Sequence, residues 1–222
     1  MSLVTVQNTV GVQRVEVMPA DLVTQQILAV MDDVPPHAAK TGALGGAEVV
    51  LAVARCSLDF GFPLVVDPVM ISKHGAPLLS PDAVESIRTV LLPRAFLVMP
   101  NLAEAEVLTG REVNNVEQMR GAAQALMDMG ARAVLVKGGH LEGDAIDVLF
   151  DGATFRTFAA ARIETQHTHG TGCTYSAAVT AGLASGLDLV TSITRAKEFV
   201  TRAIRTNPGI GRGHGPLNHW AD

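Results

Sequence analysis

Short apolar runs alternate along the chain with longer stretches of helical periodicity. Three of these runs are rich in Val and Leu, and each ends in a polar or glycine-rich turn: Leu64–Val66 before Asp67, Phe96–Met99 before Asn101, and Ala133–Val136 before Lys137. Runs of this length are typical of buried strands. Between and around them the spacing of apolar residues predicts helices near residues 19–31, 47–60, 82–90, 102–108, 116–129, 175–183 and 189–205.

The repeated order of strand, turn and helix predicts parallel strands with right-handed crossovers. We therefore expect an α/β fold whose sheet is covered by helices on both faces. Residues 145–158 depart from this order, because two strand patterns follow each other around Asp151-Gly152 with no helix between them. This predicts an antiparallel hairpin at the sheet edge. The whole chain, residues 1–222, is expected to form a single domain.

Charge and composition narrow the classes of function. The formal net charge is −5, and no block of Lys and Arg occurs, which argues against nucleic acid or an anionic membrane as the principal partner. No segment resembles a signal peptide or a membrane span, so we expect a cytoplasmic protein. Cys56 lies in an apolar helical stretch and is expected to be a small buried thiol. The spacings of the histidines match no zinc signature, and we expect no transition-metal site.

The segment from Thr168 to Thr174, with the sequence THGTGCT, runs directly into a predicted helix. Backbone N–H groups at the start of a helix have no intrahelical partners, and the helix dipole adds positive potential, so this turn can hold a phosphate or a developing oxyanion. The same field favours the thiolate of Cys173. For the motif alone, a glycine-rich connection that binds nothing is the alternative.

Asp67, Asn101 and Lys137 each follow an apolar run at the same kind of strand end. Ligands of parallel α/β sheets bind beyond the carboxyl ends of the strands. We therefore expect these three residues to meet the turn Gly170–Cys173 at one edge of the sheet. A structural role would explain any one of them alone, but four such ends that carry phosphate- or metal-compatible groups indicate a common site.

Several motifs, in colinear order from about Leu3 to Trp220, carry a family resemblance. They are VQNT at residues 6–9, VDPVM at 66–70, KHGAPLL at 73–79, PNLAEA at 100–105, VKGGH at 136–140, and THGTGCT at 168–174 with the following SAA at 176–178. Together they resemble the hydroxymethylpyrimidine/phosphomethylpyrimidine kinases of thiamine biosynthesis, a ribokinase-like family. The resemblance implies a three-layer α/β/α fold with a mostly parallel central sheet. It also implies ATP-dependent phosphorylation of 4-amino-5-hydroxymethyl-2-methylpyrimidine and then of its monophosphate, with Mg²⁺, in a homodimer.

The resemblance assigns catalytic roles to the turn before the predicted helix. Gly170, Thr171, Gly172 and the amide of Cys173 would form the anion hole. Cys173 occupies the position at which other ribokinase-like enzymes carry an Asp base, and its thiolate would accept the proton of the substrate hydroxyl. His169 would cover the site or help to hold the phosphate, or else be a locally bonded loop histidine.

The resemblance also implies binding residues. Asn101 and Glu104 would act on hydrated magnesium near the nucleotide phosphates, with Asp67 in the same region. Lys137 would lie close to these phosphates, and Lys73 is a second candidate that is equally well explained as a solvated loop charge. The residues implied for the pyrimidine are Gln7, whose amide offers both a donor and an acceptor, Val69, and Gly42 with Ala43 at the adjoining wall.

The chain departs from the family pattern at its start. Relatives have a strand, a glycine-rich turn and a helix before the VQNT motif, whereas this chain begins with Met1-Ser2-Leu3. We therefore expect an N-terminally truncated kinase domain, with weak or absent activity unless the gene product starts further upstream. Three alternatives stay open: a pyridoxal or pyridoxine kinase, a cysteine hydrolase that uses Cys173 and His169, and a truncated, non-catalytic nucleotide-binding protein.

Overall fold

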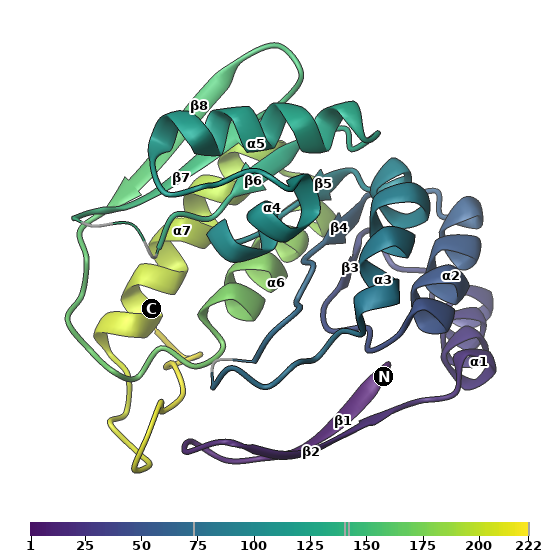
Figure 1. Cartoon of the computed structure of the whole chain (residues 1–222), viewed down its shortest axis with the longest axis horizontal. Coiled ribbons are helices and arrows are strands. Elements are labelled where there is room, and N and C mark those ends of the chain that lie inside the picture. The colour runs from purple at the N-terminus through teal and green to yellow at the C-terminus, as the bar shows by residue number, and fades with distance from the viewer. Residues whose placement is uncertain (73, 140, 142, 222) are drawn as a thin grey trace.

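A computed structural model describes residues 1–72, 74–139, 141 and 143–221. It contains a six-stranded sheet in the order β3-β4-β5-β6-β7-β8 and a separate two-stranded sheet of β1 and β2 (Figure 1). The neighbours from β3 to β6 are parallel, whereas β7 is antiparallel to both β6 and β8. The strands are β1 Leu3–Gln7, β2 Val12–Val17, β3 Ala39–Thr41, β4 Leu64–Val66, β5 Leu97–Val98, β6 Val134–Val136, β7 Ala145–Phe150 and β8 Phe155–Ala160.

The helices lie close to the positions that the apolar periodicity predicts. They are α1 Ala20–Asp33, α2 Ala47–Cys56, α3 Pro81–Ser86, α4 Leu102–Thr109, α5 Val116–Asp128, α6 Thr171–Ala184 and α7 Leu189–Arg205, with short turns η1 Ser57–Asp59, η2 Ile87–Leu91 and η3 Leu92–Arg94. Among the described residues, no helix combines the length and the apolar character that a bilayer crossing requires.

Helices cover both faces of the large sheet, and consecutive strand residues point to opposite faces. In β4, Val66 packs into the cluster formed with α1 to α5, and Val65 packs against α6 and α7. In β5, Val98 packs into the first of these clusters and Leu97 packs against α6 and α7. These four side chains are at most 1% exposed. The two-sided burial explains why the strands read as continuous apolar runs, and it confirms the predicted three-layer architecture.

The predicted edge hairpin is also present. β7 and β8 pair in register from Ala145 opposite Ala160 to Phe150 opposite Phe155. The Asp151 side chain accepts hydrogen bonds from the backbone amides of Ala153 and Thr154, which closes the turn. The hairpin follows β6 in the strand order, so β8 is one edge strand of the sheet. The sequence pattern predicts this edge position.

The β1–β2 hairpin and the short β3 are not indicated by the apolar pattern. The hairpin lies apart from the large sheet (Figure 1). Its base is fastened by the Ser2 hydroxyl, which donates to the carbonyl of Ala43 at 2.7 Å. At its tip, Nε2 of His74 lies 2.9 Å from the carbonyl oxygen of Thr9. The hairpin therefore spans the space between the end of β3 and the loop that follows β4.

Candidate active site

The carboxyl ends of the four parallel strands form one edge, and the register continues into the residues that follow them. The amide of Asp67, after β4, donates to the carbonyl of Thr41 at 3.4 Å. Asn101, after β5, forms a parallel bridge with Lys137, after β6, whose amide donates to Pro100 at 2.8 Å. The predicted convergence of Asp67, Asn101 and Lys137 is therefore present in the structure.

A buried ion pair links these strand ends to helix α6. The Lys137 ammonium donates to Oδ1 of Asp67 at 2.7 Å, and the Ser176 hydroxyl on α6 donates to Oδ2 at 2.8 Å. Asp67 is 1% exposed. Burial by itself lowers the pKa of Lys137, but Asp67 and Glu104 outweigh it and hold this pKa above its ordinary value. Lys137 therefore carries a fixed positive charge at the strand edge.

Helix α6 begins at this positive charge. Gly170 precedes it as the N-cap with φ +85°, a left-handed conformation that glycine adopts without a steric penalty. The Lys137 ammonium lies 3.4 Å from the point where a side chain on Gly172 would begin. The amides of Gly172 and Cys173 occupy the first turn, where N–H groups lack intrahelical acceptors, whereas the Thr171 amide donates to the Thr168 carbonyl at 3.3 Å. The helix dipole and the lysine thus create positive potential at the same place, which favours an anion.

Asn101 and Glu104 form a capping box at the start of α4. The Asn101 side chain accepts from the Glu104 amide at 2.9 Å, and the Glu104 carboxylate accepts from the Asn101 amide at 2.7 Å. Glu104 is 6% exposed. Its burial raises the pKa of the carboxyl above the ordinary value, although Lys137 and the Asn101 amide lower it. This arrangement presents a carboxylate from a rigid helix end to the same edge as Lys137.

Cys173 differs from the sequence expectation in one respect. Although Cys173 is exposed at the surface, partial loss of hydration around its thiol raises the pKa, and Asp67 adds to this rise, while Lys40 and Lys137 lower the pKa in part. The net direction is upward, so the thiol rather than the thiolate is the main form near neutral pH. The helix terminus alone predicts the opposite, because it takes no account of the buried carboxylate beneath the turn.

Lys40, on β3, is a member of this edge that the sequence reasoning missed. Its ammonium lies 3.5 Å from the point where a side chain on Gly42 would begin, and its charge acts on Cys173. The sequence carries only a partial signal, because Lys40 stands two residues before a glycine and Lys137 stands one residue before a glycine. The run before Lys40 is too short and too polar to read as a buried strand.

A second buried pair, also missed, supports the turn that follows Lys137. Asp147 on β7 accepts from the Gly138 amide at 3.0 Å and from the Lys197 ammonium on α7 at 2.7 Å. A side chain on Gly138 would begin 1.9 Å from the carbonyl oxygen of Ile146. The turn after β6 is therefore fixed both by a charged hydrogen bond and by close packing of backbone on backbone.

The residues implied for the pyrimidine lie on neighbouring segments. Gly42 and Ala43 follow β3, and Val69 follows Asp67 with its amide bonded to the Asp67 carbonyl at 2.8 Å. Gln7 is exposed at the end of β1, on the separate hairpin. His169 directly precedes the N-cap of α6, and its amide donates to Gly215 at 3.1 Å. Lys73 lies outside the described residues.

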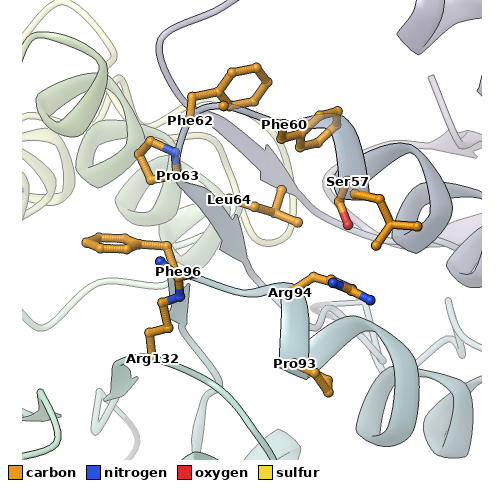
Figure 2. Close-up of a pocket in the computed structure, with 11 residues that line it drawn as sticks. Ser57, Phe60, Phe62, Pro63, Leu64, Pro93, Arg94, Phe96 and Arg132 are labelled. Carbon is orange, nitrogen blue, oxygen red and sulfur yellow. The ribbon is translucent and has the colours of Figure 1, made fainter.

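A hollow of about 500 Å³ lies at the amino ends of the strands, opposite the carboxyl ends that carry the site (Figure 2). Its lining includes Leu64 at the start of β4, and Phe96 and Arg132 just before β5 and β6. None of the predicted site residues lines it. The buried ion pair and the capping box lie instead at the carboxyl ends of the strands, where parallel α/β sheets bind their ligands.

The helix-covered, mostly parallel sheet, with a helix start, a buried lysine and a capping-box carboxylate at the carboxyl ends of its strands, is the fold of ribokinase-like kinases, as its similarity to a solved kinase structure shows. Residues 1–218 match the phosphomethylpyrimidine kinase family, and the chain belongs to that family. It is 43% identical over 224 residues to the hydroxymethylpyrimidine/phosphomethylpyrimidine kinase of Bacillus subtilis, covering 100% of this chain and 83% of that protein.

Two further similarities bear on the assignment. The chain is 46% identical over 221 residues to the thiamine biosynthesis bifunctional protein ThiED of Geobacter sulfurreducens. This match covers 99% of this chain but only 45% of that longer protein. Its structure is similar to an ADP complex of Bacillus subtilis pyridoxal kinase, with a TM-score of 0.89, 34% identity, and coverage of 99% of this chain and 83% of that one. The predicted family and fold are confirmed, and two of these three similar proteins are named kinases.

Proposed function

We propose that this protein transfers the γ-phosphoryl group of ATP to the hydroxymethyl group of 4-amino-5-hydroxymethyl-2-methylpyrimidine, and then to the resulting monophosphate, in thiamine biosynthesis. The observation that carries the proposal is the meeting of Lys137, Asp67 and the start of α6 at one strand edge. Phosphoryl transfer needs positioning and charge neutralisation more than covalent chemistry. The names of the relatives supply the substrate class.

Each part of the edge has a role in this reaction. The amides of Gly170 to Cys173 hold the transferred phosphoryl group, and Lys137 balances its charge. Asn101 and Glu104 face the nucleotide phosphates. Gln7, Gly42, Ala43 and Val69 bind the pyrimidine ring and its substituents. His169, beside the helix start, holds the phosphate or covers it.

The carboxylates fit a hydrated magnesium ion rather than a protein cage. Both oxygens of Asp67 already accept hydrogen bonds, from Lys137 and Ser176, and Glu104 accepts from Asn101. Within the described residues no group of three His, Cys, Asp or Glu side chains is arranged to hold a metal. Mg²⁺ usually keeps several waters and binds through one or two carboxylates plus phosphates. When bound, the ion neutralises charge on the phosphates. Glu104 and Asp67 would contact it through water.

Cys173 accepts the proton of the substrate hydroxyl. The raised pKa makes the thiolate a minor form at neutral pH, and Lys40 and Lys137 stabilise that form. The rate of turnover should therefore rise with pH above neutrality, as more of the thiol ionises. A cysteine hydrolase would use the same thiol but would leave Asn101, Glu104 and Lys137 without a role.

A substrate panel tests the proposal. The protein is assayed with ATP and Mg²⁺ against the hydroxymethylpyrimidine, its monophosphate and pyridoxal, as wild type and as Cys173→Ala. We expect ADP release with the two pyrimidines, a loss of about 10²-fold or more in Cys173→Ala, and ADP affinity within about twofold of wild type. Full turnover in Cys173→Ala removes this residue from the mechanism. Nucleotide binding without turnover of any substrate indicates a non-catalytic nucleotide-binding protein.

Pyridoxal phosphorylation is the second candidate function, and the likeness to a pyridoxal kinase favours it. The ratio of kcat/KM for pyridoxal to that for the pyrimidine decides between the two. Cytoplasmic location and a homodimer are also part of the proposal. The homodimer rests on the resemblance to the family, and sedimentation at micromolar concentration tests it.

A further inference from the structure

The C-terminal loop of residues 209–216, here called the glycine segment, packs on the tip of the β1–β2 hairpin (Figure 1). A side chain on Gly213 would begin 2.1 Å from the carbonyl oxygen of Thr9, and one on Gly211 would begin 2.4 Å from Cγ2 of Thr9. The Gly213 amide also lies 3.4 Å from the Thr9 hydroxyl. These separations leave no room for a Cβ at either position, so the contact depends on glycine.

The hairpin is held at both ends, and Gln7 lies between them. At the tip, Thr9 contacts the glycine segment and His74. At the base, a side chain on Gly45 would begin 2.6 Å from Cγ2 of Val17, which places β2 directly on the turn after β3. Since Gln7 is two residues from Thr9, the position of the tip determines how far Gln7 stands from the strand edge.

The glycine segment also reaches the anion-binding turn. The Gly215 carbonyl accepts from the His169 amide at 3.1 Å, and Pro216 forms a parallel bridge with His169. The Gly215 amide donates to Nδ1 of His167 at 3.2 Å. Because residue 169 directly precedes Gly170, the segment connects the hairpin tip to the start of α6.

We propose that Gly211 and Gly213 are positioning residues that set how closely the hairpin, and with it Gln7, approaches the pyrimidine. The inference rests on the proposed function, in which Gln7 contacts the pyrimidine ring. A side chain at position 213 would push Thr9 outward and lift the tip. The nucleotide would be affected much less, because Lys137, Asn101 and the start of α6 are held by other contacts. Pyrimidine recognition should weaken while nucleotide binding stays.

This effect is separable from a general loss of stability. Neither hydrophobic cluster contains a described residue of 1–17 or 209–216. A substitution in the glycine segment therefore leaves the cores on both faces of the large sheet intact. Gly213 is the cleaner test position, because Gly211 has φ +90°, where any side chain is strained whatever the space around it.

The experiment compares Gly213→Ala with Gly11→Ala. Gly11 lies in the loop of the same hairpin, has no heavy atom within 4 Å of its Cβ position, and, like Gly213, lacks a positive φ. For Gly213→Ala we expect the KM of the hydroxymethylpyrimidine to rise about tenfold or more, with the KM of ATP within about twofold of wild type. Gly11→Ala should leave both constants within about twofold. An unchanged pyrimidine KM in Gly213→Ala, or an equal rise in both constants, overturns the proposal.

Hydrogen exchange gives a second readout that needs no substrate. The amides of β1 and its loop should exchange about tenfold faster in Gly213→Ala than in wild type and in Gly11→Ala. If the wild type phosphorylates no pyrimidine, the proposed function is wrong. Independently of that result, unchanged exchange of the β1 amides in Gly213→Ala overturns the positioning role. Should Gly213→Ala fail to fold, Thr9→Ala and Thr9→Ser repeat the comparison. Loss of the hydroxyl should raise the pyrimidine KM about two- to fivefold, and Thr9→Ser should not.

Discussion

The buried pair of Lys137 and Asp67 predicts an asymmetry between two substitutions. Lys137→Met removes the cation and leaves two buried carboxylates, those of Asp67 and Glu104, near each other without it. Asp67→Asn removes one carboxylate, but the lysine keeps the favourable interaction with Glu104, and the Asn oxygen can still accept from its ammonium. Loss of the lysine should therefore destabilise the fold more than loss of the aspartate charge.

The magnitude follows from burial. The side chains of Lys137 and Asp67 are 11% and 1% exposed, so solvent screens the pair weakly. Breaking a buried pair by removing one partner costs about 3–5 kcal/mol, which we expect for Lys137→Met. For Asp67→Asn we expect about 1.5–3 kcal/mol, the contribution of a hydrogen bond to a charged group. In a domain of this size about 2–4 °C of Tm corresponds to 1 kcal/mol, so Lys137→Met should lower Tm by about 6–20 °C.

Urea unfolding followed by circular dichroism at pH 7 measures these differences in wild type, both single variants and the double variant. The loss of unfolding free energy in the double variant should be smaller than the sum of the two single losses by about 1 kcal/mol or more, because the two side chains are in contact. The reasoning is refuted if Asp67→Asn is the more destabilising change, or if the two losses simply add. Either result would mean that Glu104 and Asp67 do not share the charge of Lys137.

Two further predictions test the electrostatics and the capping box. Alkylation of Cys173 by iodoacetamide should rise with pH with a midpoint above the ordinary value for a thiol, and Lys40→Met should move it higher still, because a stabilising cation is lost. Cys56 is buried and should not react. An unchanged midpoint in Lys40→Met contradicts the inference that the charge of Lys40 acts on the Cys173 thiol. Asn101→Ala and Asn115→Ala each remove the side chain that caps a helix and should each cost about 1 kcal/mol of stability. Only Asn101→Ala should also reduce turnover, and equal activity in the two variants contradicts a role for Asn101 at the nucleotide.

Elements with a clear apolar period could be predicted from the sequence, and elements set by tertiary contacts could not. The predicted helix at 189–205 coincides with α7, and the run Leu64–Val66 coincides with β4, because both bury apolar side chains at a fixed spacing. β3 has three residues and carries the polar Lys40 and Thr41, so its place in the sheet depends on pairing with β4. The β1–β2 hairpin is held by contacts of Ser2 and Thr9 with distant loops, which no local pattern indicates.

The same division applies to the site. The strand-end rule brings Asp67, Asn101 and Lys137 together, because topology alone places them at one edge. Their partners could not be predicted, since Asp67 is 70 residues from Lys137 and 109 residues from Ser176. The pKa of Cys173 shows the consequence. The helix start predicts a thiolate, but desolvation and a carboxylate from another strand reverse the direction, and both depend on the folded structure.

The distribution of charge explains how the positive groups at this edge remain stable in the folded protein when no anion is bound. Lys40, Lys137 and the start of α6 would repel one another if nothing opposed them, and a buried lysine without a partner would lose its proton. Asp67 and Glu104 prevent this loss, because both carboxylates stabilise the charged form of Lys137. Ser176 fixes the Asp67 carboxylate on the side away from the lysine, so the pair has one geometry. In the proposed reaction, a phosphate at this edge would meet dipoles and a charge that are already oriented. Preorganisation of this kind favours the transition state of phosphoryl transfer, because nothing has to rearrange as charge develops.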